Sequence, residues 1–154
     1  MLCIGGLFVS EDLIFNIRLT YFALEKVKHL YFEKQNLTAS QGDLLLYLGF
    51  ASRVKDEISQ KDIEQHFRLS NPTVTGLLNR LEEKGFVKRQ KSTIDGRTNN
   101  ILLTEKSTDV LNQFKSHKEA MDQKICRGFS NDDVKQLVKY LKNIQTNLKS
   151  EDIK

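Results

Sequence analysis

Proline and glycine are scarce in this chain: proline occurs once and glycine eight times among 154 residues. These low counts exclude collagen-like and low-complexity architectures, and with abundant leucine, lysine and glutamate they favour helix. Long hydrophobic runs are missing as well, because the longest, 44–51, is far shorter than the roughly 20 residues that span a bilayer. The apolar start, 1–10, lacks the basic residues of a signal peptide. We therefore expect a globular, cytoplasmic protein with no membrane partner.

Cysteine and histidine are too few and too scattered for most metal or catalytic sites. The two cysteines form no CxxC pair, which indicates free thiols and argues against a structural zinc site. None of the three histidines has a histidine or cysteine four residues on, and a glycine-rich phosphate loop and a nucleophile elbow are absent. We therefore expect no enzymatic activity, no catalytic or metal-binding residues and no cofactor. The residues concerned are Cys3, Cys126, His29, His66 and His117.

The positive charge of the chain is concentrated in one segment. The net charge is +4, and the segment 84–97 contains five basic residues against a single carboxylate, Asp95. That segment therefore sums to +4 and the rest of the chain to zero. A nucleic-acid contact requires such a local positive field, although a solvated basic hairpin would have the same composition. The basic residues are Lys84, Lys88, Arg89, Lys91 and Arg97.

The first part of the chain is predicted to be helical. Apolar residues recur at three- and four-residue steps in the first helix, and this wide apolar stripe must be covered by something. Thr38 with Gln41, and Ser59 with Asp62, have the spacing at which a helix cap and the third helical residue bond each other. The expected helices cover 10–34, 38–51 and 60–67.

The centre of the chain predicts a helix followed by a hairpin. Asn71 is a good N-cap with Pro72 at the first helical position, and Gly85 is placed to end the helix. Two short strands then flank a polar turn that contains Asp95 and Gly96, which is typical of a hairpin. The helix is expected over 71–84 and the strands over 86–92 and 99–104.

Two more helices are expected after the hairpin. Thr104 caps the first of them and Ser130 the second. The apolar residues of the last helix have a spacing close to a heptad seam. Such a helix can pack on its own domain or form a contact between subunits, and both alternatives are open at this point.

These elements have the arrangement of a winged helix-turn-helix. The helices 60–67 and 71–84 are separated by the brief turn 68–70, which is the spacing of a helix-turn-helix, and the basic hairpin follows as a wing. Such a helix can enter the major groove of DNA, and a basic hairpin can reach the neighbouring minor groove or the backbone. The expected fold class is mainly α, an α+β winged helix with long terminal helices.

Four motifs occur in order within 69–107, LSNPTVTGLLNRLEEKGFVKRQKSTIDGRTNNILLTEKS: a T-V-T helix, R-L-E-x-x-G, a wing with Asp-x-Arg, and L-T-E-K. In these motifs the chain resembles the MarR family of bacterial and archaeal transcriptional regulators. The resemblance covers nearly the whole chain and implies a winged-helix homodimer whose terminal helices interlock across the two-fold axis. Gly76 departs from the pattern, because many relatives have a larger or basic residue there. The implied organisation is a single domain over 1–154, with a DNA-binding region over 36–104 and dimerisation helices over 10–34 and 105–150.

Helical spacing assigns a DNA-facing side to the recognition helix. If its apolar residues face the core, the polar residues near its N-terminus can meet base edges or phosphates, aided by the helix dipole. Threonine methyl groups can touch thymine, and asparagine can read adenine. Asn71 could also serve only as the helix cap. The expected contacts are Asn71, Thr73, Thr75, Asn79 and Arg80.

The wing supplies a second set of expected contacts. The resemblance assigns Arg97 to the minor groove, where a guanidinium gains from the enhanced negative potential, and it assigns Asp95 to bracing that arginine. Lys88, Arg89 and Lys91 alternate along the first strand, so some of them must face away from DNA. We expect one or two of these three to contact phosphate.

Together these features predict a sequence-specific, dimeric, DNA-binding transcriptional regulator that acts as a repressor and is relieved by a small effector. Its recognition helix, 71–84, would enter the major groove and its wing, 87–103, the minor groove of a pseudo-palindromic double-stranded operator. The alternative is a winged-helix module that binds another protein and not DNA. The resemblance also implies ligands, metals or oxidants as effectors, and Cys126, which lies near Lys124 and Arg127, is a candidate redox-sensing thiol.

Overall fold

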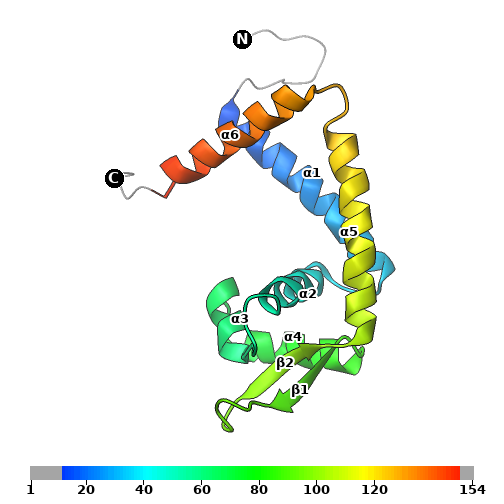
Figure 1. The fold of residues 1–154 in the computed structure, drawn as a ribbon, viewed down its shortest axis with the longest axis vertical. Coiled ribbons are helices and arrows are strands. Elements are labelled where there is room, and N and C mark those ends of the chain that lie inside the picture. The colour runs from blue at the N-terminus through cyan, green and yellow to red at the C-terminus, as the bar shows by residue number, and fades with distance from the viewer. Residues whose placement is uncertain (1–11, 150–154) are drawn as a thin grey trace. The chain divides into compact units, whose positions relative to one another are not determined.

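The computed structural model describes residues 12–149, so Cys3, the first two residues of the expected helix 10–34, and position 150 lie outside the described part. Between 12 and 149 the chain forms six helices and two strands (Figure 1). No helix in that range is long and apolar enough to cross a membrane. The elements are α1 (Leu13–Lys34), α2 (Ala39–Ala51), α3 (Gln60–Phe67), α4 (Asn71–Glu83), β1 (Val87–Lys91), β2 (Asn99–Leu103), α5 (Glu105–Ile125) and α6 (Asn131–Asn147).

The chain divides into two compact units within α5, between Asn112 and Gln113. The first unit holds α1 to α4, the hairpin and the start of α5, and the second holds the rest of α5 and α6. The mainly α winged-helix fold class is confirmed, and the ends of the elements differ from the expected ranges by a few residues at most.

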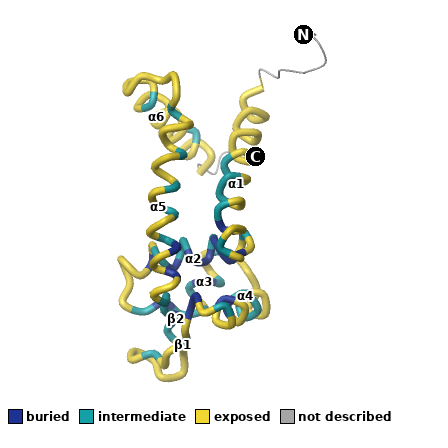
Figure 2. The backbone as a smooth tube through the Cα atoms, turned by 90° about the vertical axis from the view of Figure 1, so that its right-hand side faces the viewer, coloured by how far each residue is buried: buried dark blue, intermediate teal, exposed yellow. Residues whose placement is uncertain are grey.

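The core of the first unit lies between α2, α3, α4 and the hairpin, where Figure 2 shows most of the buried backbone. α2 is central, as its apolar sequence predicts, and three of its four leucines, Leu44, Leu45 and Leu48, are almost fully buried. Burying one such side chain stabilises the fold by about 1.5–3 kcal/mol. This packing fixes where the polar faces of α4 and the hairpin point. The core side chains include Leu44, Leu45, Leu48, Ile63, Val74, Leu78, Leu81, Phe86, Val87 and Ile101.

The cap of α4 is the one predicted cap that is wrong. The reciprocal capping boxes at Thr38, Ser59 and Ser130 are present. For α4, however, the N-cap is Ser70, in extended conformation, and Asn71 is already the first helical residue. The physical reason is a competing partner, because the Asn71 side-chain amide donates across the turn to Glu64 Oε1 at 2.7 Å.

A glycine ends α4, as predicted. Gly85 has a positive φ of 75°, which an L side chain rarely adopts. Its N–H donates to the Glu82 carbonyl at 2.9 Å, and the Phe86 N–H donates to the Leu81 carbonyl at 2.8 Å. This pair of bonds is a Schellman motif, and it turns the chain from α4 directly into β1.

The hairpin is a two-stranded antiparallel sheet. Its register pairs Val87 with Leu103 and Lys91 with Asn99. The third strand that winged helices often add is reduced, among residues 12–149, to one bridge between Ser59 and Asn100. Next to this bridge, the Ile101 N–H donates a hydrogen bond to the Ile58 carbonyl at 2.8 Å. The hairpin is therefore joined to the start of α3 as well as to α4.

The apolar stripes of α1 and α6 are exposed in the single chain. Phe32 is the only buried residue of α1, and α6 has none among its described residues. Figure 2 shows the resulting exposed backbone along both helices. Exposed apolar stripes of this size mark surfaces that another partner covers. On α1 they include Leu13, Ile14, Phe15, Leu19 and Phe22, and on α6 Leu137, Val138, Tyr140 and Leu141.

Candidate nucleic-acid interface

α4 turns one side to the core and the other outward. Its side chains at three- and four-residue steps are fully buried, which leaves the intervening polar positions on the surface. Gly76 lies on this polar side, and a Cβ added to it would meet nothing within 4 Å. Of the expected contacts on this helix, Asn71, Thr73, Asn79 and Arg80 are exposed and Thr75 is half-buried.

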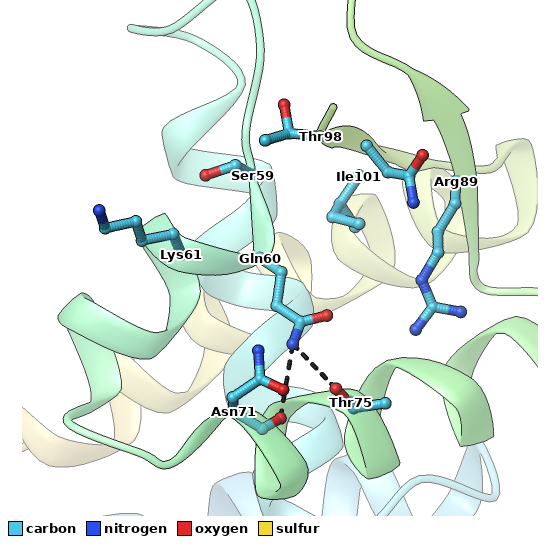
Figure 3. Close-up of a pocket in the computed structure, with 9 residues that line it drawn as sticks. Ser59, Gln60, Lys61, Asn71, Thr75, Arg89, Thr98 and Ile101 are labelled. Carbon is cyan, nitrogen blue, oxygen red and sulfur yellow. Dashed lines mark hydrogen bonds between the residues drawn. The ribbon is translucent and has the colours of Figure 1, made fainter. Parts of the chain in front are cut away.

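A layer of hydrogen bonds from α3 lies behind the N-terminal end of α4 (Figure 3). Gln60 Nε2 donates to Thr75 Oγ1 at 2.8 Å and approaches the Asn71 carbonyl oxygen at 3.4 Å and Glu64 Oε1 at 3.0 Å. Gln60, Thr75 and Asn71 border a hollow of about 330 Å³ between α3, α4 and the hairpin, and Arg89 extends toward α4 on its other side. The hollow is thus bordered by residues from all three elements of the expected interface.

Arg89 joins the hairpin to α4. Its Nη2 donates to Asn79 Oδ1 at 2.8 Å, and its Nη1 forms an ion pair with Glu82. The sequence groups Arg89 with Lys88 and Lys91 as expected phosphate contacts, but only Arg89 is engaged in this way. Lys88 and Lys91 are exposed and form no ion pair within residues 12–149.

The tip of the wing is shaped by Asp95. Asp95 Oδ1 accepts the backbone N–H of Arg97 at 3.0 Å, and the Asp95 carbonyl accepts the N–H of Thr98 at 2.9 Å. The bracing between Asp95 and Arg97 therefore runs through the backbone. The exposed Arg97 guanidinium has no partner in the described part of the chain.

Glu57 anchors the start of the loop between the two strands of the wing, a role that sequence reasoning missed. Its carboxylate accepts the Thr93 N–H at 2.8 Å, the Thr93 hydroxyl at 2.6 Å and the Ser92 hydroxyl. The Ser92 hydroxyl oxygen in turn accepts the N–H groups of Ile94 and Asp95, at 3.1 and 3.0 Å. The hydrogen bonds from Ser92 and then Thr93 hold the pKa of the Glu57 carboxyl below its usual value.

Sequence reasoning also missed Gln60, Glu64 and Glu82, which hold the expected contact residues from behind. No local pattern marks them, because each bonds a residue on another helix or strand. By contrast, the expected DNA contacts on α4 could be found from the sequence, since helical spacing alone separates the outer face of α4 from its core face.

Other side chains of interest lie outside this interface. Among residues 12–149, no group of three or more His, Cys, Asp or Glu side chains is placed to hold a metal ion. His66 stacks on Tyr47, with 4.2 Å between the ring centroids. Cys126 is a free, half-buried thiol in the second unit.

Comparison with known proteins finds relatives among transcriptional regulators. Residues 35–98 match the family model described as MarR family. The HTH-type transcriptional regulator SarZ of Staphylococcus haemolyticus is 28% identical over 142 residues, which is 91% of each chain. The central region of the chain, which holds α2 to α4 and most of the hairpin, thus resembles the MarR family. A second relative, the HTH-type transcriptional regulator BilQ of Clostridioides difficile, is 29% identical over 70% of this chain and 74% of its own.

The winged-helix fold of this chain is similar to that of solved structures, among them MepR. The S. aureus MepR structure has a TM-score of 0.76 at 25% identity, and covers 89% of this chain and 98% of MepR. A crystal structure of a MepR–DNA complex has a TM-score of 0.71 at 25% identity, with 90% and 99% of the two chains covered. The transcriptional regulator SlyA has a TM-score of 0.66 at 27% identity, with 89% and 94% covered.

Proposed function

We propose that this protein is a homodimeric transcriptional repressor of the MarR type that places α4 in the major groove and the wing, 87–103, in the adjacent minor groove of a pseudo-palindromic operator. The observation that carries the proposal is the joint placement of α4 and the wing. Arg89 of β1 bonds Asn79 and Glu82 of α4, so the wing, which carries Arg97, is held against α4. The similarity to MepR, which has been crystallised with DNA, supports the same use of this fold.

The apolar faces of the terminal helices support the dimer. Within α6, Leu137, Val138 and Leu141 are each more than two-fifths exposed, and their spacing is that of a subunit seam. α1 exposes an apolar stripe of its own. A second copy covering these faces would set two winged helices on half-sites about one helical turn of DNA apart. We include in this proposal a DNA-binding region over 36–104 and dimerisation helices over 10–34 and 105–150.

Charge supports the DNA contact. Lys88, Lys91 and Arg80 are exposed, and three phosphate contacts per protomer would make six in a dimer. Six such contacts would weaken binding about 10³-fold when the salt concentration rises from about 50 to 200 mM. Arg97 adds a guanidinium suited to a narrow minor groove.

The test is fluorescence-anisotropy binding to a duplex selected from a random pool by the wild-type chain. Arg97→Ala should lose about 1–3 kcal/mol of binding free energy, whereas Lys139→Ala removes the same charge from exposed α6 and should change it little. Absence of salt-sensitive binding to any selected duplex would refute the proposal and favour the protein-binding alternative. Equal losses of binding free energy in Arg97→Ala and Lys139→Ala would refute only the role of Arg97 and leave the rest of the proposal intact.

Three less direct features complete the proposal: a cytoplasmic location, no catalytic activity, and relief of repression by a small effector. They are supported by the similarity of the chain to a family of transcriptional regulators. The effector is tested in the same anisotropy assay, in which a relieving compound raises the Kd for the selected duplex at constant salt. A relieving compound must bind the DNA-free form more tightly than the DNA-bound form, by the factor by which Kd rises.

A further inference from the structure

The orientation of the Gln60 side-chain amide is dictated by its surroundings. Three atoms lie within hydrogen-bond distance of one end of this amide: Thr75 Oγ1, Glu64 Oε1 and the Asn71 carbonyl oxygen. The carboxylate and the carbonyl can only accept, so the end that faces them is the NH₂ group. Gln60 is therefore a donor to Thr75, and its oxygen is left on the side of the hollow toward Arg89 (Figure 3).

This donation determines what the Thr75 hydroxyl can offer. A hydroxyl has one hydrogen and two lone pairs, and one lone pair of Thr75 Oγ1 is used by Gln60. Within residues 12–149 no group accepts the Thr75 hydrogen. Thr75 is half-buried at the edge of the hollow, on the outer side of α4. Its hydrogen is consequently available to a group outside the protein.

We propose that Gln60 is a positioning residue that fixes the Thr75 hydroxyl as a hydrogen-bond donor toward DNA, so that α4 selects an acceptor atom at one place in each half-site. The acceptor is an oxygen or nitrogen of a base edge, or a phosphate oxygen, and both have the chemistry that a hydroxyl donor recognises. This inference rests on the proposed DNA-binding function and adds the polarity of one contact to it.

Glu64 supports the same arrangement from behind. Its Oε1 accepts both from Gln60, at 3.0 Å, and from the side-chain amide of Asn71, at 2.7 Å. A carboxylate oxygen can accept from two donors at once, so the NH₂ groups of Gln60 and Asn71 both face Glu64. Thus α3 sets the donor and acceptor pattern of Asn71 and Thr75 in the first two turns of α4.

The test is a double-mutant cycle for binding to the duplex selected by the wild-type chain. Thr75→Val keeps the shape and removes the hydroxyl, and Gln60→Met keeps the length and removes the donor. Each should weaken binding about 3- to 10-fold, as expected for one neutral hydrogen bond. Gln60→Met should have no effect when it is combined with Thr75→Val. Gln65→Met, at an exposed position of the same helix, is the matched control and should bind like wild type.

A base-pair scan and a scan of neutral methylphosphonate linkages then locate the acceptor. If the acceptor is on a base, one base-pair change per half-site weakens wild type but neither Thr75→Val nor Gln60→Met. If it is a phosphate oxygen, one methylphosphonate behaves in this way. If the role of Gln60 were purely structural, Gln60→Met would be weakened by the same base-pair and methylphosphonate changes as wild type.

Two results would overturn the inference while leaving the proposed function intact. One is an equal effect of Gln60→Met in the wild-type chain and in the Thr75→Val variant. The other is that no base-pair change and no methylphosphonate weakens binding by wild type while leaving both variants unaffected. Failure of the wild-type chain to select any duplex would instead overturn the proposed function, and this inference with it.

Discussion

The contact between α1 and α2 makes a sharp prediction for Gly42→Ala. Gly42 is buried in α2, directly against the ring of Phe32 in α1. A Cβ at position 42 would lie 2.4, 2.6 and 2.9 Å from three ring carbons, and real Cβ atoms essentially never approach closer than 3.0 Å. Phe32 has no exposed surface, so its ring has no open space to move into. The substitution must therefore separate the two helices or distort the ring.

The expected size of the effect follows from two opposing contributions. Alanine in place of a helical glycine is favourable by about 1 kcal/mol. Overpacking a close-packed core usually costs about 1–3 kcal/mol, and a fully buried ring places this contact toward the upper end. We expect Gly42→Ala to lower the free energy of unfolding by about 1–2 kcal/mol, or about 2–4 °C in Tm for each kcal/mol.

The assay is urea unfolding followed by circular dichroism, at one fixed chain concentration because a dimer's stability depends on it. Gly76→Ala is the matched control, since it also replaces a helical glycine but has nothing within 4 Å of the new Cβ. The control should be more stable than wild type by about 0.5–1 kcal/mol. If Gly42→Ala proved as stable as Gly76→Ala, the steric argument would be refuted.

Two further predictions concern the wing and α6. The pKa of Glu57 is lowered from 4.5 by the hydrogen bonds of Ser92 and Thr93, so the stabilisation it provides is present above that value and lost as the pH falls through the folded-state pKa. Glu57→Gln should therefore lower the urea midpoint at neutral pH, and the difference from wild type should shrink as the pH falls below 4.5; a constant difference would contradict this. Leu141→Glu places a charge on the apolar face of α6 and should shift the dimer toward monomer in light scattering. An unchanged mass would show that α6 is not a subunit seam.

The helices and the hairpin could be predicted from sequence because their signals are local. The capping boxes at Thr38, Ser59 and Ser130 each join residues three positions apart, and Gly85 ends α4 through its own backbone conformation. The polar turn around Asp95 is closed by bonds that span two or three residues. Interactions of this range form as soon as the local backbone does, so a linear pattern is enough to identify them.

The outer face of α4 could be predicted from sequence for the same reason, because the helical period places Thr73, Asn79 and Arg80 on the side opposite the core. The family resemblance added Arg97 and the dimer, which no period reveals.

What holds these side chains depended on the tertiary structure. Asn71 was predicted to cap α4, but packing of α3 against α4 brings Glu64 within reach and the amide bonds there instead. Arg89 finds Asn79 ten residues away, and Thr93 finds Glu57 at a separation of 36. Such pairs meet only after burial of the core has set the relative positions of α3, α4 and the hairpin. The sequence alone determines the elements because local bonds form them, and the fold decides the polar contacts between elements because burial of the core brings distant side chains together.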